Sequence, residues 1–147
     1  MKALIQRVSS ASVRVENKTV SRIGKGLLVL LCVEKGDSEA DAAMLAGKAA
    51  RLRIFENAEG KMGLSVLDIH GEALVISQFT LAADMSKGNR PSFEKAEAPE
   101  KAKQLYKLFV KELSSAGVPV KEGVFGAHMD VALVNDGPVT IWLETGE

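Results

Sequence analysis

The chain contains 147 residues, of which 46% are hydrophobic, and its 19 basic and 19 acidic residues give a formal net charge of zero. This length and composition predict one domain, residues 1–147, with a sizeable core, and the neutral charge argues against nonspecific coating of DNA. The sequence has neither a signal-peptide pattern nor an apolar run of membrane-spanning length, so we expect a soluble, cytoplasmic protein.

The first part of the chain predicts a meander of antiparallel strands followed by a helix. Apolar alternation or continuous apolar runs mark strands at residues 2–8, 11–15, 19–23 and 27–33. A helix from about Ser38 to Arg53 follows, because Ser38 is a good N-cap residue and apolar residues then recur at helical spacing.

The second part predicts a hairpin, a strand, a helix and two closing strands. The hairpin joins residues 53–55 to 65–67, and the strands cover 71–81, 128–134 and 139–144. Pro99 suits the first turn of the second helix, and Gly117 its end. We therefore expect an α+β fold, with a mostly antiparallel, curved or barrel-like sheet and two packed helices.

Conventional catalytic side chains are scarce. Cys32 lies in an apolar segment, where a thiol usually behaves as a small buried hydrophobe, and His70 and His128 are isolated in the sequence. Neither a Ser-His-Asp triad nor a histidine-rich metal site can be assembled from them. We expect no metal and no cofactor.

One candidate site is the segment Ser77-Gln78-Phe79-Thr80, at the end of a predicted strand. The hydroxyls of Ser77 and Thr80 lack a base nearby in the sequence, so ordinary strand-end hydroxyls are the default interpretation. The alternative is a site made of main chain, because unpaired N–H groups of Gln78 and Phe79 would bind an oxyanion.

A second candidate is the predicted turn at residues 135–140, which contains Gly137-Pro138. Gly-Pro is common in ordinary turns, whereas a cis peptide would mark a specialised one. Both interpretations remain open on sequence alone.

A basic stripe on the second helix is the third candidate. Lys103, Lys107 and Lys111 recur every four residues, and the loop before them carries Lys87, Arg90 and Lys95. A solvated helix face is the default, and a surface that follows RNA phosphates is the alternative.

Five short sequence blocks, spread over the whole chain, together match the pattern of a known family. They are Ile-Gln-Arg-Val at 5–8, Ser-Gln-Phe-Thr-Leu at 77–81, Arg-Pro-Ser-Phe at 90–93, Phe-Gly-Ala-His-Met at 125–129 and Asn-Asp-Gly-Pro-Val-Thr at 135–140. In this order the blocks resemble the D-aminoacyl-tRNA deacylases of the standard bacterial and eukaryotic type.

The resemblance implies a homodimer with active sites at the subunit interface, which removes D-amino acids, and also glycine, from tRNA. We expect neither membrane nor DNA partners. In that family the Gly-Pro peptide is cis and enters the pocket of the other subunit, a role that falls by position on Gly137 and Pro138. Arg7, Phe125 and Met129 match positions that hold or line that pocket.

The resemblance also suggests a mechanism of chiral proofreading. A Gly137 carbonyl that binds the ammonium of a D-amino acid would form a wall that rejects an L side chain, whereas glycine has no side chain to reject. The Gln78 and Phe79 N–H groups would bind the ester oxygen, beside Thr80. The 2′-hydroxyl of the terminal ribose would activate the attacking water.

Two other functions remain possible from the sequence. A non-catalytic dimeric RNA-binding module would bind charged tRNA without loss of the ester. A hydrolase of small D-amino acid esters would use the same oxyanion donors without a basic surface, and its turnover would not depend on salt.

Overall fold

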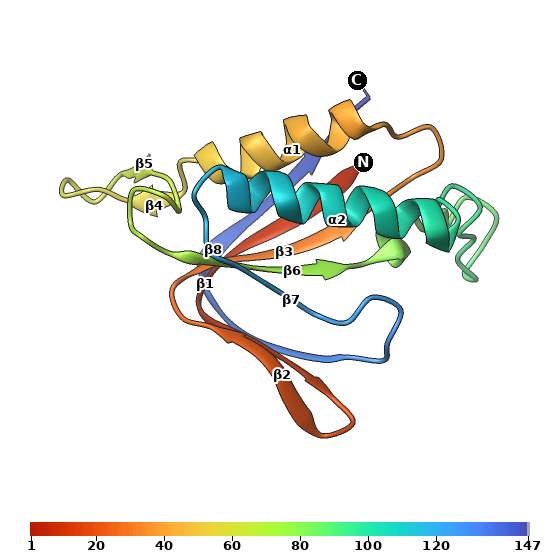
Figure 1. The fold of residues 1–147 in the computed structure, drawn as a ribbon, viewed down its shortest axis with the longest axis horizontal. Helices are drawn as coiled ribbons and strands as arrows, with labels where there is room; N and C mark the ends of the chain where they lie inside the picture. Colours follow the sequence, from red (N-terminus) through yellow and green to blue (C-terminus); the bar gives the residue numbers. More distant parts are fainter. Residues whose placement is uncertain (147) are drawn as a thin grey trace.

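Two helices cover one face of a strongly curved sheet in the computed structural model, which describes residues 1–146 (Figure 1). The sheet strands are β1 (Lys2–Val15), β2 (Lys18–Ile23), β3 (Gly26–Cys32), β6 (Glu72–Ser77), β7 (Val120–Glu122) and β8 (Asp130–Glu144). Their order is β2-β1-β3-β6-β7, and β8 pairs with β1 along almost its whole length.

The sheet is mixed, which corrects the expectation of a mostly antiparallel one. β1 is antiparallel to β2, β3 and β8, but β3 is parallel to β6, and β6 to β7. Along the sequence, helix α1 (Glu39–Arg51) comes between β3 and β6, and α2 (Pro99–Ser115) comes between β6 and β7. A helical crossover returns the chain to the end where the previous strand began, so the next strand runs parallel.

The predicted hairpin and the strand after it have different bounds in the structure, and one strand was not predicted. The hairpin is smaller, with β4 at Phe55–Glu56 and β5 at Met62–Leu64, and residues 65–67 are not a strand. The strand predicted at 71–81 ends at Ser77 and is followed by a 3-10 turn at Phe79–Ala82. The short strand β7 was not predicted, because its three residues carry little apolar pattern.

The predicted C-terminal turn is instead a bulge inside a continuous strand. β1 pairs Gln6 with Thr140 and Val8 with Asn135, so residues 136–139 all lie opposite Arg7. The chain does not reverse there because β8 pairs with β1 on both sides of the bulge. We call residues 136–139 the Gly-Pro bulge.

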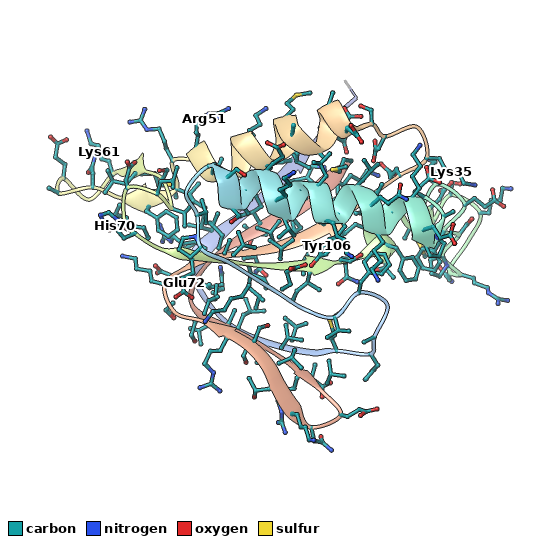
Figure 2. All side chains as sticks on the ribbon, in the orientation of Figure 1. Lys35, Arg51, Lys61, His70, Glu72 and Tyr106 are labelled. Atoms are coloured by element: carbon teal, nitrogen blue, oxygen red, sulfur yellow. The ribbon has the colours of Figure 1, made fainter. Side chains whose placement is uncertain are left out.

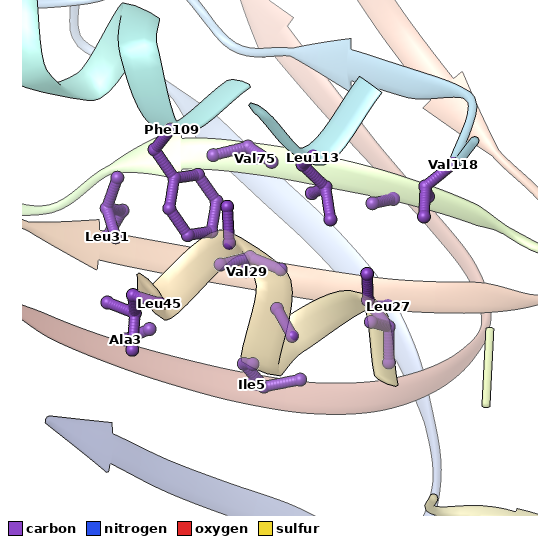
Figure 3. Close-up of a cluster of buried hydrophobic side chains, with 14 of the residues drawn as sticks. Ala3, Ile5, Leu27, Val29, Leu31, Leu45, Val75, Phe109, Leu113 and Val118 are labelled. Atoms are coloured by element: carbon purple, nitrogen blue, oxygen red, sulfur yellow. The ribbon is translucent and has the colours of Figure 1, made fainter. Parts of the chain in front are cut away.

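Strand β3 is apolar throughout because both of its faces are buried. Val29 joins Ile5 and Val75 of the neighbouring strands under Leu45 of α1 and Phe109 of α2 (Figure 3). The alternate residues of the strand face a second cluster inside the curve of the sheet, which contains Val8, Val13, Leu28, Leu74 and Ile76.

Among the described residues, no helix is long and apolar enough to cross a membrane.

Helix α1 begins at the predicted cap. The Ser38 Oγ accepts a hydrogen bond from Asp41 N at 3.3 Å, and the Asp41 carboxylate accepts one from Ser38 N at 2.8 Å. This capping box satisfies N–H groups that a helix start leaves without partners. The main-chain bond from Ser38 is also the largest cause of the lowered pKa of Asp41.

We expect Ser38→Ala to lower the free energy of unfolding by about 1 kcal/mol, since the cap acceptor is lost. Urea denaturation followed by circular dichroism measures this change. Ser38→Thr is the matched control, because it keeps a cap hydroxyl and is expected to retain most of the stability. Equal losses in the two variants would contradict a capping role for Ser38.

Candidate functional site

A cavity of about 770 Å³ lies beyond the end of β6. Ser77, Gln78 and Phe79 form one part of its wall, and Phe125 and Met129 form another. Two of the sequence blocks, 77–81 and 125–129, which are separated by 43 residues of chain, therefore meet at one cavity. The start of α2 and the segment that precedes it supply further lining, including Ala98, Pro99 and Ala102.

The main-chain donors at this cavity differ from the predicted pair. Gln78 N donates to Leu31 O at 2.8 Å, so the prediction that the Gln78 N–H is unpaired was wrong. Gln78 continues the pairing of β6 with β3 for one residue beyond the strand end. The N–H groups of Phe79 and Thr80 start the 3-10 turn and have no hydrogen-bond partner within residues 1–146. The free N–H groups are therefore displaced by one residue, and of the two residues Phe79 lines the cavity whereas Thr80 is not part of its lining.

The side chains of this turn make one hydrogen bond with each other and one aromatic contact with Phe93. Gln78 Nε2 donates to Thr80 Oγ1, and no acid, lysine or histidine of the described chain is hydrogen-bonded to the Thr80 hydroxyl. The ring of Phe79 is 56% exposed and contacts the Phe93 ring edge to face, with 5.2 Å between centroids.

Cys32 lies behind this turn, with its Sγ 3.6 Å from Phe79 O. Burial is the largest cause that raises the pKa of the Cys32 thiol to about 11. The thiol is therefore protonated at neutral pH, and it is not a nucleophile at this site.

Three titratable side chains line the cavity, and sequence reasoning gave a role to none of them. Glu97 accepts a hydrogen bond from Ala98 N at 2.8 Å, which lowers its pKa and makes it a weak base. His128 has a side chain that is 96% exposed, and its Nε2 lies 4.0 Å from Asp130. Lys35 is the third. Residues 1–146 contain no cluster of His, Cys, Asp or Glu placed to bind a metal.

The Gly-Pro bulge is a separate structure, fixed by Arg7. Arg7 Nε donates to Asp136 O at 2.8 Å, and its Nη1 donates to Ile54 O at 2.7 Å, with the side chain only 7% exposed. Asn135 Nδ2 donates to both Arg7 O and Val139 O, at 3.0 and 3.1 Å. The Gly137-Pro138 peptide bond is cis, and both residues are exposed.

Within one chain, the Gly-Pro bulge lies far from the cavity. None of its residues lines the cavity. Across the sheet Ser77 is level with Leu31 and Ala3, whereas the bulge is opposite Arg7, four residues further along β1. Four residues of strand span about 13 Å, and two strands, β3 and β1, lie between Ser77 on β6 and the bulge on β8. Arg7, Gly137 and Pro138 are thus not brought together with Ser77, Gln78, Phe79, Phe125 and Met129.

The lysines of α2 lie on its solvent side. The helix buries Leu105, Tyr106, Phe109 and Leu113, whereas Lys103, Lys107 and Lys111 are exposed. Successive members of an every-fourth-residue row rotate by about 40° around a helix, so the stripe turns away from the cavity as it proceeds. Its contact with RNA stays a prediction.

The chain is similar to known proteins over nearly its whole length. The sequence model of the family described as D-Tyr-tRNA(Tyr) deacylase matches residues 4–144. The D-aminoacyl-tRNA deacylase of Dinoroseobacter shibae is 59% identical over 98% of this chain and 99% of that protein. That of Thermomicrobium roseum is 58% identical over 100% and 96%.

Two solved structures have a similar fold. A c-Myc DNA unwinding element binding protein superposes with a TM-score of 0.95 at 42% identity, over the whole of both chains. A structure described as a probable eukaryotic D-amino acid tRNA deacylase has a TM-score of 0.81 at 18% identity, over 97% of each chain, and this second likeness concerns the fold alone.

Proposed function

The chain belongs to the D-Tyr-tRNA(Tyr) deacylase family, and from this membership we propose that it hydrolyses the ester of D-aminoacyl-tRNA, and of glycine mischarged on tRNA, in the cytoplasm. Like its relatives it is a hydrolase that acts on ester bonds. The observation that carries the proposal is the cavity lined by Phe79, whose main-chain N–H, like that of the adjacent Thr80, has no hydrogen-bond partner within residues 1–146.

These two N–H groups are the proposed oxyanion donors. Attack on an ester carbonyl places a negative charge on its oxygen, and donors already aimed at that oxygen stabilise the transition state. Each such donor contributes about 3 kcal/mol in comparable enzymes. Gln78 acts indirectly, because its N–H fixes the strand end and its side chain binds the Thr80 hydroxyl.

The active unit in this proposal is a homodimer in which the Gly-Pro bulge of one protomer closes the cavity of the other. The bulge is exposed, has its shape fixed by Arg7 and Asn135, and lies away from its own cavity. In a partner's cavity the Gly137 carbonyl would accept a hydrogen bond from the ammonium of a D-amino acid. An L side chain would then meet the bulge, whereas glycine would not, so selection acts by rejection.

Release of tyrosine from matched D-tyrosyl-tRNA and L-tyrosyl-tRNA tests the proposal. We expect the D ester to be lost at least about a hundredfold faster, which corresponds to about 2.7 kcal/mol of discrimination. D-tyrosine methyl ester is the control for a small-ester hydrolase, whose turnover would match that of the tRNA ester. Binding of charged tRNA without any ester loss would instead identify a non-catalytic RNA-binding module.

A further inference from the structure

We propose that Lys35 and Lys95 form a phosphate-binding rim for the single-stranded 3′ end of tRNA, an inference that rests on the proposed function. The rim consists of the short segments 33–35 and 95–97. Lys35 N donates to Lys95 O at 2.9 Å, and Glu97 N donates to Val33 O at 3.0 Å. These bonds form a small antiparallel ladder around the bridge between Glu34 and Ala96.

The ladder places Lys35 opposite Lys95, next to the cavity that Lys35 lines. In its register Lys35 lies opposite Lys95, so both side chains leave the same face. Lys35 also lines the cavity, and it lies at the end of the molecule where α2 begins (Figure 2). Like charges directly opposite one another on paired strands destabilise a fold. An anionic ligand would relieve this repulsion.

The acidic side chains of the rim are in ion pairs with lysines outside it, whereas the rim lysines act on carboxyls only at longer range: Lys35 helps to lower the pKa of Glu97, and Lys95 that of Asp84. Glu34 forms an ion pair with Lys2 at 3.2 Å, and Glu97 forms one with Lys101 at 3.5 Å. Lys35 and Lys95 are exposed, and neither is in an ion pair within the described part of the chain. The net chemistry that the rim offers to a ligand is therefore cationic.

The loop next to the rim extends this cationic edge. Two hydrogen bonds between Asp84 and Ser92, at 2.8 and 3.0 Å, close the loop at its base. Lys87 and Arg90 lie inside it, are exposed, and have no ion pair among residues 1–146. Lys35 thus lines the cavity, and three more cations lie on the adjoining segments 84–92 and 95–97, so a polyanion that enters the cavity from this side would pass them.

Unpaired RNA fits this arrangement. In the proposed function the cavity holds the terminal aminoacyl-adenosine, so the nucleotides before it must leave along the cavity edge. Their phosphates carry one negative charge each, and lysines bind such charges with release of counterions. The rim therefore sets affinity for tRNA, and the α2 stripe is not required, since it rotates away from the cavity.

The test compares two variants with the same loss of charge. Lys35→Gln/Lys95→Gln removes the rim cations, and Lys107→Gln/Lys111→Gln removes two from α2. Anisotropy of labelled, uncharged tRNA at several salt concentrations measures affinity. Two lost phosphate contacts on a single strand make the slope of log K against log salt shallower by roughly 1.4, and affinity at low salt roughly tenfold weaker. We expect these changes in the rim variant and not in the α2 variant.

Measurements of kcat/KM on two substrates distinguish failure of the rim from failure of the proposed hydrolase. The ratio of kcat/KM on D-tyrosyl-tRNA to that on D-tyrosyl-adenosine is expected to fall roughly tenfold in the rim variant, because only tRNA has the phosphates before the terminal nucleoside. Equal losses in the two double variants, or an unchanged salt slope in the rim variant, would overturn the rim. Rim-dependent binding by a parent protein that releases no D-tyrosine would support the rim and refute the hydrolase.

Discussion

D-tyrosyl-tRNA that ends in 2′-deoxyadenosine is expected to be a nearly inert substrate, with a rate at least about a thousandfold below that of the natural ester. General-base help typically contributes 10²- to 10⁴-fold, so removal of the group that activates water removes a factor of this size. In the proposed mechanism this group is the 2′-hydroxyl of the substrate. Single-turnover release of labelled tyrosine measures the rate without interference from product release.

Two protein groups are the competing bases, and each has a control variant. The Thr80 hydroxyl binds Gln78 Nε2 and has no base among its partners in residues 1–146, so Thr80→Ala is expected to keep most of the activity. His128 lines the cavity, and its ring is almost fully exposed, so His128→Gln is also expected to remain active. Full activity on the deoxy substrate, together with loss in either variant, would move the catalytic base to the protein.

Local sequence signals predicted the helices well. The expected helix at about Ser38 to Arg53 is α1, Glu39–Arg51, because the cap and the apolar spacing are both local features. Pro99 begins α2 as predicted, for the same reason. The parallel pairings of β3 with β6 and of β6 with β7 were not predictable in this way, because each joins strands that are separated by a whole helix. The sequence of a strand does not indicate whether its partner runs parallel or antiparallel to it.

Sequence reasoning singled out some of the residues that line the cavity but not the geometry there, and their role in a site stays a prediction. Ser77, Gln78, Phe79, Phe125 and Met129 do line one cavity. Which amide is free, however, depends on the last hydrogen bond between β6 and β3, and Gln78 N makes that bond, so the free amides begin at Phe79. The distance between the cavity and the Gly-Pro bulge depends on the register across three strands, which periodicity within one strand does not determine.

Gly137→Ala is expected to remove most D-specific activity while the protein stays folded. A Cβ on Gly137 would collide with Asn135 Oδ1 and lie 3.2 Å from its Cγ. Asn135 cannot move freely, because its Nδ2 binds Arg7 O and Val139 O. Loss of these two hydrogen bonds costs about 2 kcal/mol of stability. The displaced Gly137 carbonyl would no longer meet the substrate ammonium, so kcat/KM on D-tyrosyl-tRNA should fall roughly a hundredfold, or about 2.7 kcal/mol.

Gly24→Ala is the matched control, because the same added methyl meets nothing within 4 Å there, and it should leave activity unchanged. Mixing then tests whether the bulge acts across subunits. Ala127→Trp should block the cavity that Ala127 lines while leaving its own bulge intact. Random pairing of Gly137→Ala with Ala127→Trp makes heterodimers with one complete site, so about a quarter of the parental activity should return. No recovery in the mixture would mean that each bulge serves its own chain, because only a bulge that reaches the partner's cavity can complement.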